Sequence, residues 1–156
     1  MKGDAATKDA RAGPPPFHLA FPVHDLAAAD AFYGDALGCR RGRRSEAWID
    51  YDFFGHQIVA HLSPEIARAD ATRTSATSAV DGDAVPVRHF GVVLSPDEWR
   101  DLAARLEAAS ADFIIPPRTR FAGEPGEQGT FFVRDPSGNA LEFKCFADMG
   151  RLFAAD

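Results

Sequence analysis

Residues 17–23 read FHLAFPV and residues 88–94 read RHFGVVL, so the chain contains two similar segments that each have histidine in second place. In both segments apolar side chains alternate with other residues, which is the pattern of a half-buried β-strand. A helix signal follows each segment, because Asp25 and Ser95 are good N-cap residues and each precedes an apolar stripe with helical spacing. The sequence therefore predicts an internal repeat that begins with a strand and a helix.

The repeat continues to the end of each copy. Residues 52–55 (DFFG) match residues 135–138 (DPSG), and both are turn sequences between segments with strand patterns. The predicted strands are residues 48–52 and 57–62 in the first copy, and residues 113–115, 130–134 and 140–146 in the second. The fold class is therefore predicted as α+β, with two tandem βαβββ modules. Neither module alone covers both faces of its sheet, so the two must pack together or against a second chain.

These patterns divide the chain into five parts. Residues 1–16 are small, charged and rich in proline at their end, and are predicted to be a disordered N-terminal arm. The first module is predicted over residues 17–62 and the second over residues 88–146. Residues 63–87 are rich in Ser, Thr, Ala and Asp, and are predicted to be a linker long enough to act as a flap. Residues 147–156 form a C-terminal tail.

Composition and charge exclude several classes of function. The 156 residues are 46% hydrophobic and carry a net charge of −6, which suits a domain with a real core and argues against nucleic-acid binding. No apolar run approaches the roughly 20 residues of a membrane span, and the N-terminus has no secretory pattern. Cys39 and Cys145 form no metal-binding or disulfide pattern. A cytoplasmic protein without a nucleic-acid or membrane partner is expected.

The chemistry is predicted to lie with two histidines and one glutamate. Strand alternation places His18 and His89 opposite the apolar faces of their strands, while Glu142 interrupts a strand that is otherwise suited to burial. A buried carboxylate requires a partner, and a cation held by two imidazoles and one carboxylate forms a facial triad with open positions. The alternatives are histidines that serve the core or surface and an ordinary ion pair between Glu142 and Lys or Arg.

Two stretches resemble a known family. Residues 18–26 (HLAFPVHDL), with FY at 32–33 and LG at 37–38, are similar to the opening of glyoxalase/bleomycin-resistance/extradiol-dioxygenase proteins, the vicinal oxygen chelate superfamily. Residues 132–143 (FVRDPSGNALEF) resemble their closing hairpin. The resemblance implies a curved, mostly antiparallel half-barrel sheet with helices outside. It also implies that His18, His89 and Glu142 bind a divalent metal, which we expect to be Fe, Mn, Ni, Zn or Co.

The chain departs from the family pattern at two positions. Glyoxalase I-like members place a fourth ligand where this chain has Val59, which cannot bind a metal. His61 lies two residues further along the same strand face, as a displaced fourth ligand, a neutral base for proton transfer, or a structural residue. Extradiol dioxygenases often have a tyrosine where this chain has Phe132, and this difference weakens the case for ring cleavage.

The resemblance implies a metal-dependent enzyme that chelates two adjacent oxygens of a small-molecule substrate, with lyase, isomerase or dioxygenase chemistry. His61 is the predicted catalytic residue. The alternative is a non-catalytic drug-binding resistance protein of the same fold. A metal-free regulatory module would require the three ligands to be fortuitous. A homodimer is expected in either of the first two cases.

Overall fold

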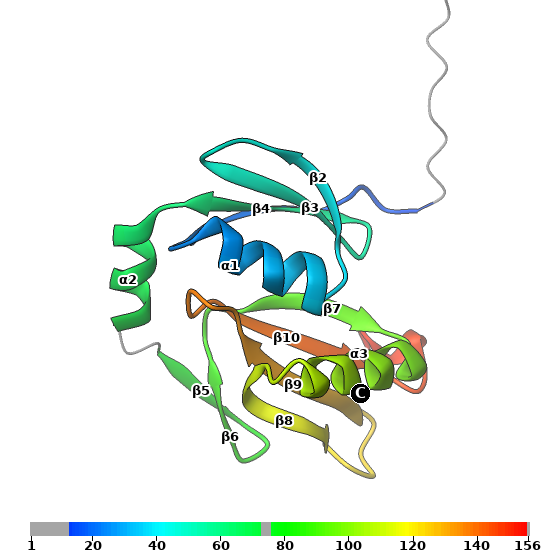
Figure 1. The fold of residues 1–156 in the computed structure, drawn as a ribbon. Helices are drawn as coiled ribbons and strands as arrows, with labels where there is room; N and C mark the ends of the chain where they lie inside the picture. The colour runs from blue at the N-terminus through cyan, green and yellow to red at the C-terminus, as the bar shows by residue number, and fades with distance from the viewer. Residues whose placement is uncertain (1–12, 73–75, 156) are drawn as a thin grey trace, which may run out of the picture.

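The computed structural model of the protein describes residues 13–72 and 76–155 (Figure 1). The first module contains β1 (His18–Val23), α1 (Leu26–Asp30) continued by the π-helical turn η1 (Ala31–Ala36), β2 (Arg40–Arg44), β3 (Trp48–Phe53) and β4 (His56–Leu62). Between the modules lie α2 (Pro64–Thr72), β5 (Thr77–Val80) and β6 (Asp83–Pro86). The second module contains β7 (Phe90–Leu94), α3 (Pro96–Ala108), β8 (Asp112–Arg120), β9 (Gln128–Arg134) and β10 (Ala140–Cys145), followed by η2 (Met149–Arg151).

The two modules have the same topology. The first sheet has the order β1-β4-β3-β2 and the second has the equivalent order β7-β10-β9-β8. In each sheet the opening strand pairs in parallel with the final strand, and the remaining pairs are antiparallel. The predicted α+β class with a repeated βαβββ pattern is confirmed, and its strands lie in two separate four-stranded sheets.

Both module helices begin where the sequence predicts. The side chain of Asp25 accepts a hydrogen bond from the backbone N–H of Ala28, which satisfies one of the free donors at the start of α1. Ser95 and Glu98 form a reciprocal capping box at the start of α3. The two caps fix where each helix begins, directly after the C-terminal ends of β1 and β7.

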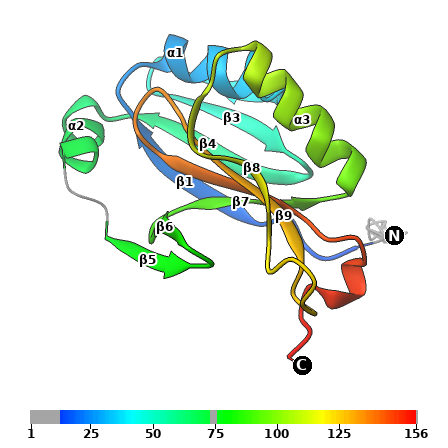
Figure 2. The ribbon, with the colours of Figure 1, turned by 90° about the horizontal axis from the view of Figure 1, so that it is seen from below.

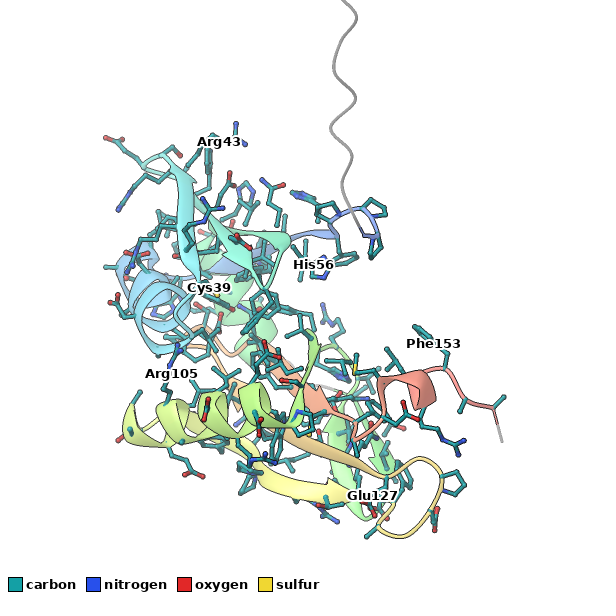
Figure 3. The ribbon with its side chains drawn as sticks, turned by 90° about the vertical axis from the view of Figure 1, so that its right-hand side faces the viewer. Cys39, Arg43, His56, Arg105, Glu127 and Phe153 are labelled. Atoms are coloured by element: carbon teal, nitrogen blue, oxygen red, sulfur yellow. The ribbon has the colours of Figure 1, made fainter. Side chains whose placement is uncertain are left out.

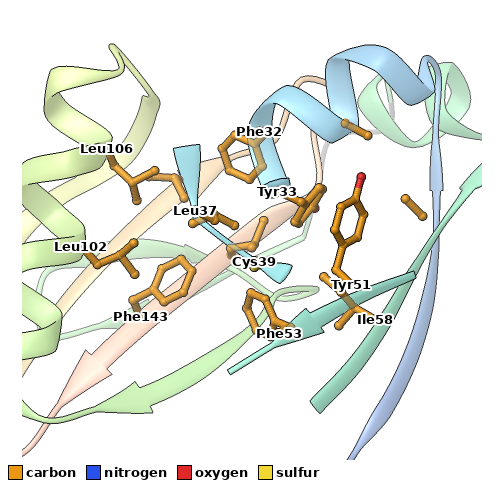
Figure 4. Close-up of a cluster of buried hydrophobic side chains, with 14 of the residues drawn as sticks. Phe32, Tyr33, Leu37, Cys39, Tyr51, Phe53, Ile58, Leu102, Leu106 and Phe143 are labelled. Carbon is orange, nitrogen blue, oxygen red and sulfur yellow. The ribbon is translucent and has the colours of Figure 1, made fainter. Parts of the chain in front are cut away.

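A single hydrophobic core joins the two modules. Figure 4 shows Leu102 and Leu106 of α3 and Phe143 of β10 beside Phe32, Leu37 and Phe53 of the first module. The rings of Phe53 and Phe143 lie 6.1 Å apart, centre to centre. Because the core takes the helix-facing side of each sheet, the other side of each sheet remains for the candidate site.

The predicted linker has secondary structure of its own. It contains α2 and the β5–β6 hairpin, whose turn residues Asp81 and Gly82 both have positive φ, as a tight two-residue hairpin turn requires. Val85 of the hairpin packs with Ile115 and Phe132 on the side of the second sheet that faces away from α3 (Figure 2). The hairpin therefore covers part of the face that carries Glu142.

Basic residues 40–44 form the exposed edge strand β2, and Arg43 lies at the outer end of the molecule in Figure 3. The side chains of Arg40, Arg41 and Arg43 each form an ion pair with an aspartate of the first module. The predicted N-terminal arm lies largely outside the described residues. Among the described helices none is long and apolar enough to cross a membrane.

Candidate functional site

Glu142 lies in β10 on the face opposite the core. Its neighbours Leu141 and Phe143 are buried in the core, so strand alternation points the Glu142 carboxylate to the other side of the sheet. Glu142 is only 5% exposed, and the hydroxyl of Thr130 on β9 donates a hydrogen bond to its Oε1 at 2.8 Å. The carboxylate is thus held in place by its neighbouring strand.

His89 lies just before β7 and reaches the same carboxylate. Its Nε2 is 3.1 Å from Oε2 of Glu142, and its Nδ1 is 2.5 Å from the carbonyl oxygen of Pro86, at the end of the hairpin. A carbonyl oxygen only accepts hydrogen bonds, so Nδ1 carries a proton. In the neutral ring Nε2 therefore carries a lone pair, and this lone pair faces and repels a carboxylate oxygen of Glu142. A cation between them, whether a proton or a metal ion, relieves that repulsion.

The pKa values of the pair move in opposite directions. The hydrogen bond with Glu142 raises the pKa of His89, against the lowering effect of burial. Burial acts to raise the pKa of Glu142, but hydrogen bonds from His89 and Thr130, together with the charge of Lys144, outweigh it and lower that pKa. Both shifts favour the ion pair, with a proton on His89 Nε2, over the neutral histidine.

Two further cations surround Glu142. Nη1 of Arg120, at the end of β8, is 3.6 Å from Oε1, and Nζ of Lys144 is 3.5 Å from Oε2. Arg120 is 2% exposed and Lys144 lies on the same face of β10 as Glu142. Neither residue was predicted from the sequence as part of the site, although the alternation of β10 puts Lys144 on the same strand face as Glu142.

Gly91 allows the strands that carry the pair to lie close together. It is opposite Glu142 in the parallel β7–β10 pairing, and a Cβ atom at this position would lie 1.6 Å from the backbone oxygen of Glu142. No side chain fits such a gap. Glycine at this position is therefore a requirement of the site's backbone.

His18 lies on the open face of the other sheet. Its Nδ1 is 2.8 Å from Oε1 of Gln57, whose amide nitrogen donates to Asp50 at 3.4 Å. Because an amide oxygen only accepts, Nδ1 of His18 carries the proton, and in the neutral ring its Nε2 carries the lone pair. Within the described part of a single chain, no three His, Cys, Asp or Glu side chains gather closely enough to hold a metal ion. The chain thus brings His89 and Glu142 together, and His18 lies apart from them.

The other predicted positions have distinct surroundings. His61 is exposed on β4, on the same strand face as Gln57 and Val59, and lies across from Pro22 and Trp48. Val59 itself is buried. Phe132 lies opposite Glu142 in the β9–β10 pairing, and its ring is in edge contact with that of His89, at 5.0 Å between ring centres.

A cavity of about 450 Å³ adjoins His89. It lies between β1 and β7 and is lined by residues 19–22, 87–90 and 138–140. Most of the lining is apolar, and Arg88, His89 and Asn139 are the polar members. A cavity of this size beside His89 suits a small molecule.

Residues 16–143 match the model of the glyoxalase/bleomycin resistance protein/dioxygenase superfamily, and the chain belongs to that family. A search of proteins with curated functions found no match.

Among solved structures, the chain is similar to a glyoxalase/bleomycin resistance protein/dioxygenase from Alicyclobacillus acidocaldarius, with 34% identity, a TM-score of 0.71, and coverage of 89% of this chain and 96% of that one. Two more distant structures share the fold alone. The fosfomycin resistance protein FosX from Listeria monocytogenes has 15% identity, a TM-score of 0.62 and coverage of 88% and 97%. Lactoylglutathione lyase from Agrobacterium tumefaciens has 21% identity, a TM-score of 0.60 and coverage of 92% and 99%.

Proposed function

We propose that this protein is a metal-dependent enzyme of the glyoxalase/dioxygenase type, in which His89 and Glu142 hold a divalent cation. The observation that carries the proposal is the pairing of His89 Nε2 with Glu142 Oε2 at 3.1 Å, with the Nδ1 proton of His89 committed to Pro86. Metal-binding histidines commonly donate their second ring N–H to a carbonyl or carboxylate in this way, which fixes the tautomer that binds the metal.

The spacing of the two atoms suits a shared metal ion. In an octahedral site, where neighbouring ligands lie at right angles, two ligand atoms that are each about 2.1 Å from the ion lie about 3.0 Å apart. The 3.1 Å between Nε2 and Oε2 is close to this value, so a metal ion can replace the shared proton with little movement of His89 or Glu142. The Thr130 hydroxyl holds the other carboxylate oxygen and so orients Glu142 for binding through Oε2.

His18 is the third proposed ligand, and a second copy of the chain supplies it. Like His89, it has its Nδ1 engaged by an oxygen and its Nε2 available, and Asp50 orients the intervening Gln57. It lies on the open face of the first sheet, apart from the pair. A homodimer that apposes this face of one chain to the Glu142 face of another completes a His/His/Glu triad, twice by symmetry.

The metal would supply a Lewis acid that chelates vicinal oxygens of a small substrate, with Fe, Mn, Ni, Zn or Co as the candidate ions. The side chains of this protein would bind and position the substrate. The cavity beside His89 offers an apolar wall, and His61 shares its sheet face with Gln57, the partner of His18. We propose His61 as the residue that moves a proton, because an imidazole ring can both accept and donate one.

A second candidate function is supported by a different observation. Arg120 and Lys144 already compensate the charge of Glu142, at 3.6 and 3.5 Å, and both would repel a divalent cation. A metal-free site of this kind would suit a non-catalytic small-molecule binder, such as a resistance protein of the same fold. Metal content separates the two functions.

The test is elemental analysis of untagged protein, with three variants compared with the wild type. We expect about one divalent ion per chain in the wild type, and its loss in His89→Ala and Glu142→Ala. His56→Ala is the matched control, because His56 lies at the start of β4, where its Nδ1 accepts a hydrogen bond from the backbone N–H of Phe17. Wild-type protein without a stoichiometric ion, or variants that keep it, would favour the non-catalytic binder.

A further inference from the structure

Arg120 lies buried between two carboxylates that come from different parts of the chain. Its Nη2 is 3.0 Å from Oδ2 of Asp83 in the β5–β6 hairpin, and its Nη1 is 3.6 Å from Oε1 of Glu142. Its guanidinium carbon lies 5.7 Å from the centre of the Phe132 ring. The Nε atom is buried and has no hydrogen-bond partner among the residues that the structure describes, so within them the guanidinium is anchored through its terminal nitrogens.

The two contacts of Arg120 are unequal. The Asp83 contact has the length of a charge-assisted hydrogen bond, whereas the Glu142 contact is beyond hydrogen-bond range. Arg118 also donates to Asp83, at 2.9 Å, so Asp83 receives two guanidinium groups from β8. Asp83 thus holds the guanidinium of Arg120 by the shorter of its two contacts and limits how closely Arg120 approaches Glu142.

We propose that Asp83 is a positioning residue for the metal site, and that it makes the site competent by keeping Arg120 off Glu142. The inference rests on the proposed function, since it concerns how strongly the His89–Glu142 pair binds a divalent ion. Without the charge of Asp83, Glu142 is the remaining carboxylate beside Arg120. The guanidinium then closes on Oε1 and competes with the metal for the negative charge.

The β5–β6 hairpin therefore helps to position the residues of the proposed metal site. Asp83 of β6 sets the position of Arg120, and Pro86 at the end of the same strand accepts the Nδ1 proton of His89. Both metal ligands thus depend on one short strand. Val85, between Asp83 and Pro86, is buried against Ile115 and Phe132, which holds that strand against the second sheet.

The test compares metal affinities of full-length protein, stripped of metal and titrated with Mn²⁺ and Zn²⁺ by calorimetry. We expect Asp83→Asn to bind both ions at least tenfold more weakly than the wild type. The matched control is Asp81→Asn, because Asp81 lies in the same hairpin and accepts from the backbone of Phe121, and its ion-pair partner among the described residues is Arg118 instead of Arg120. This control should stay within twofold of the wild type.

Removal of the competing charge should restore binding. The double variant Asp83→Asn with Arg120→Met is expected to return to within threefold of the wild type, since methionine fills similar space without a charge. Arg120→Met alone should bind metal at least as tightly as the wild type, and it tests the proposal even if Asp83→Asn fails to fold. Loss of metal binding in Arg120→Met would overturn the inference, because Arg120 would then support the site.

Other outcomes separate the inference from the function on which it rests. Wild-type protein that binds neither ion would overturn both. Tight wild-type binding with equal affinity in Asp83→Asn would overturn the role of Asp83 and leave the proposed metal site intact. Equal losses in Asp81→Asn and Asp83→Asn would also overturn it, since attachment of the hairpin would then be the cause.

Discussion

The hydroxyl of Tyr33, on the helix of the first module, donates a 2.8 Å hydrogen bond to Oδ2 of Asp135, in the β9–β10 turn of the second. Asn139 of the same turn also donates to the carbonyl of Pro22, and Ser137 is hydrogen-bonded to His24. The turn that was evident from the sequence therefore joins the two modules. This connection and the shared core fix how the modules pack within one chain.

Loss of this connection should weaken the whole domain. Tyr33→Phe removes a donor from a buried carboxylate, and we expect it to lower the free energy of unfolding by about 1–3 kcal/mol. Tyr51→Phe is the control, because Tyr51 donates a longer, 3.2 Å hydrogen bond to Asp30 within the first module. Urea denaturation measures both. A Tyr33→Phe variant as stable as the wild type would show that the bond contributes little to module packing.

Gly91→Ala should damage the second sheet and the site together. The added Cβ would meet the backbone oxygen of Glu142, so β7 and β10 must separate where His89 and Glu142 meet. We expect a loss of at least about 2 kcal/mol in the free energy of unfolding, in the range of overpacked cores. Gly126→Ala has room for its Cβ and is the control. Thermal denaturation of the two variants provides the comparison, and equal melting temperatures would contradict this account of Gly91.

The His89–Glu142 pair should stabilise the metal-free protein over a limited pH range, and its contribution to the free energy of unfolding should fall at both higher and lower pH. The raised pKa of His89 contributes stability that is complete below its unfolded value, about 6.5, and is lost as pH rises through the folded value. The lowered pKa of Glu142 contributes stability that is present above about 4.3 and is lost as pH falls through its folded value.

The difference in unfolding free energy between wild type and His89→Ala should therefore be largest near pH 5–6, between these limits, and shrink above the pKa of His89. Metal binding should show the opposite trend, because the ion must displace the proton on Nε2. Its affinity is expected to rise with pH through the same pKa. Chemical denaturation and metal titration across this range measure the two trends. A stability difference that does not vary with pH would indicate that the pair is not ionised as described.

Several features of the second sheet could be predicted from local sequence patterns. The strand predicted over residues 140–146 is present as β10, and alternation along it puts Glu142 on the face opposite Leu141 and Phe143. The repeated histidine, His89, lies just before the adjacent strand and within reach of Glu142. Both inferences depend on the period of a β-strand, which is a local property. The turn at Asp135 was likewise evident from its residue types.

The surroundings of Glu142 could not be predicted in the same way. Arg120 lies at the end of β8, which runs from Asp112 past two prolines and two register shifts, whereas the apolar pattern stops at Ile115. The Asp81-Gly82 hairpin turn was a readable signal, but its packing against Phe132 is a long-range contact. The ligand role of His18 depends on how copies of the chain associate, which no local pattern encodes.

Complementation between two defective variants tests the central claim most directly, because the proposed triad takes His18 from one chain and His89 and Glu142 from another. His18→Ala and Glu142→Ala protein, each unable to bind metal alone, would be mixed, unfolded, refolded together and analysed for bound ion. In a mixed dimer one of the two sites has all three native ligands, so random pairing predicts about one ion for every four chains. A mixture that binds no more metal than the separate variants would contradict a site shared between chains.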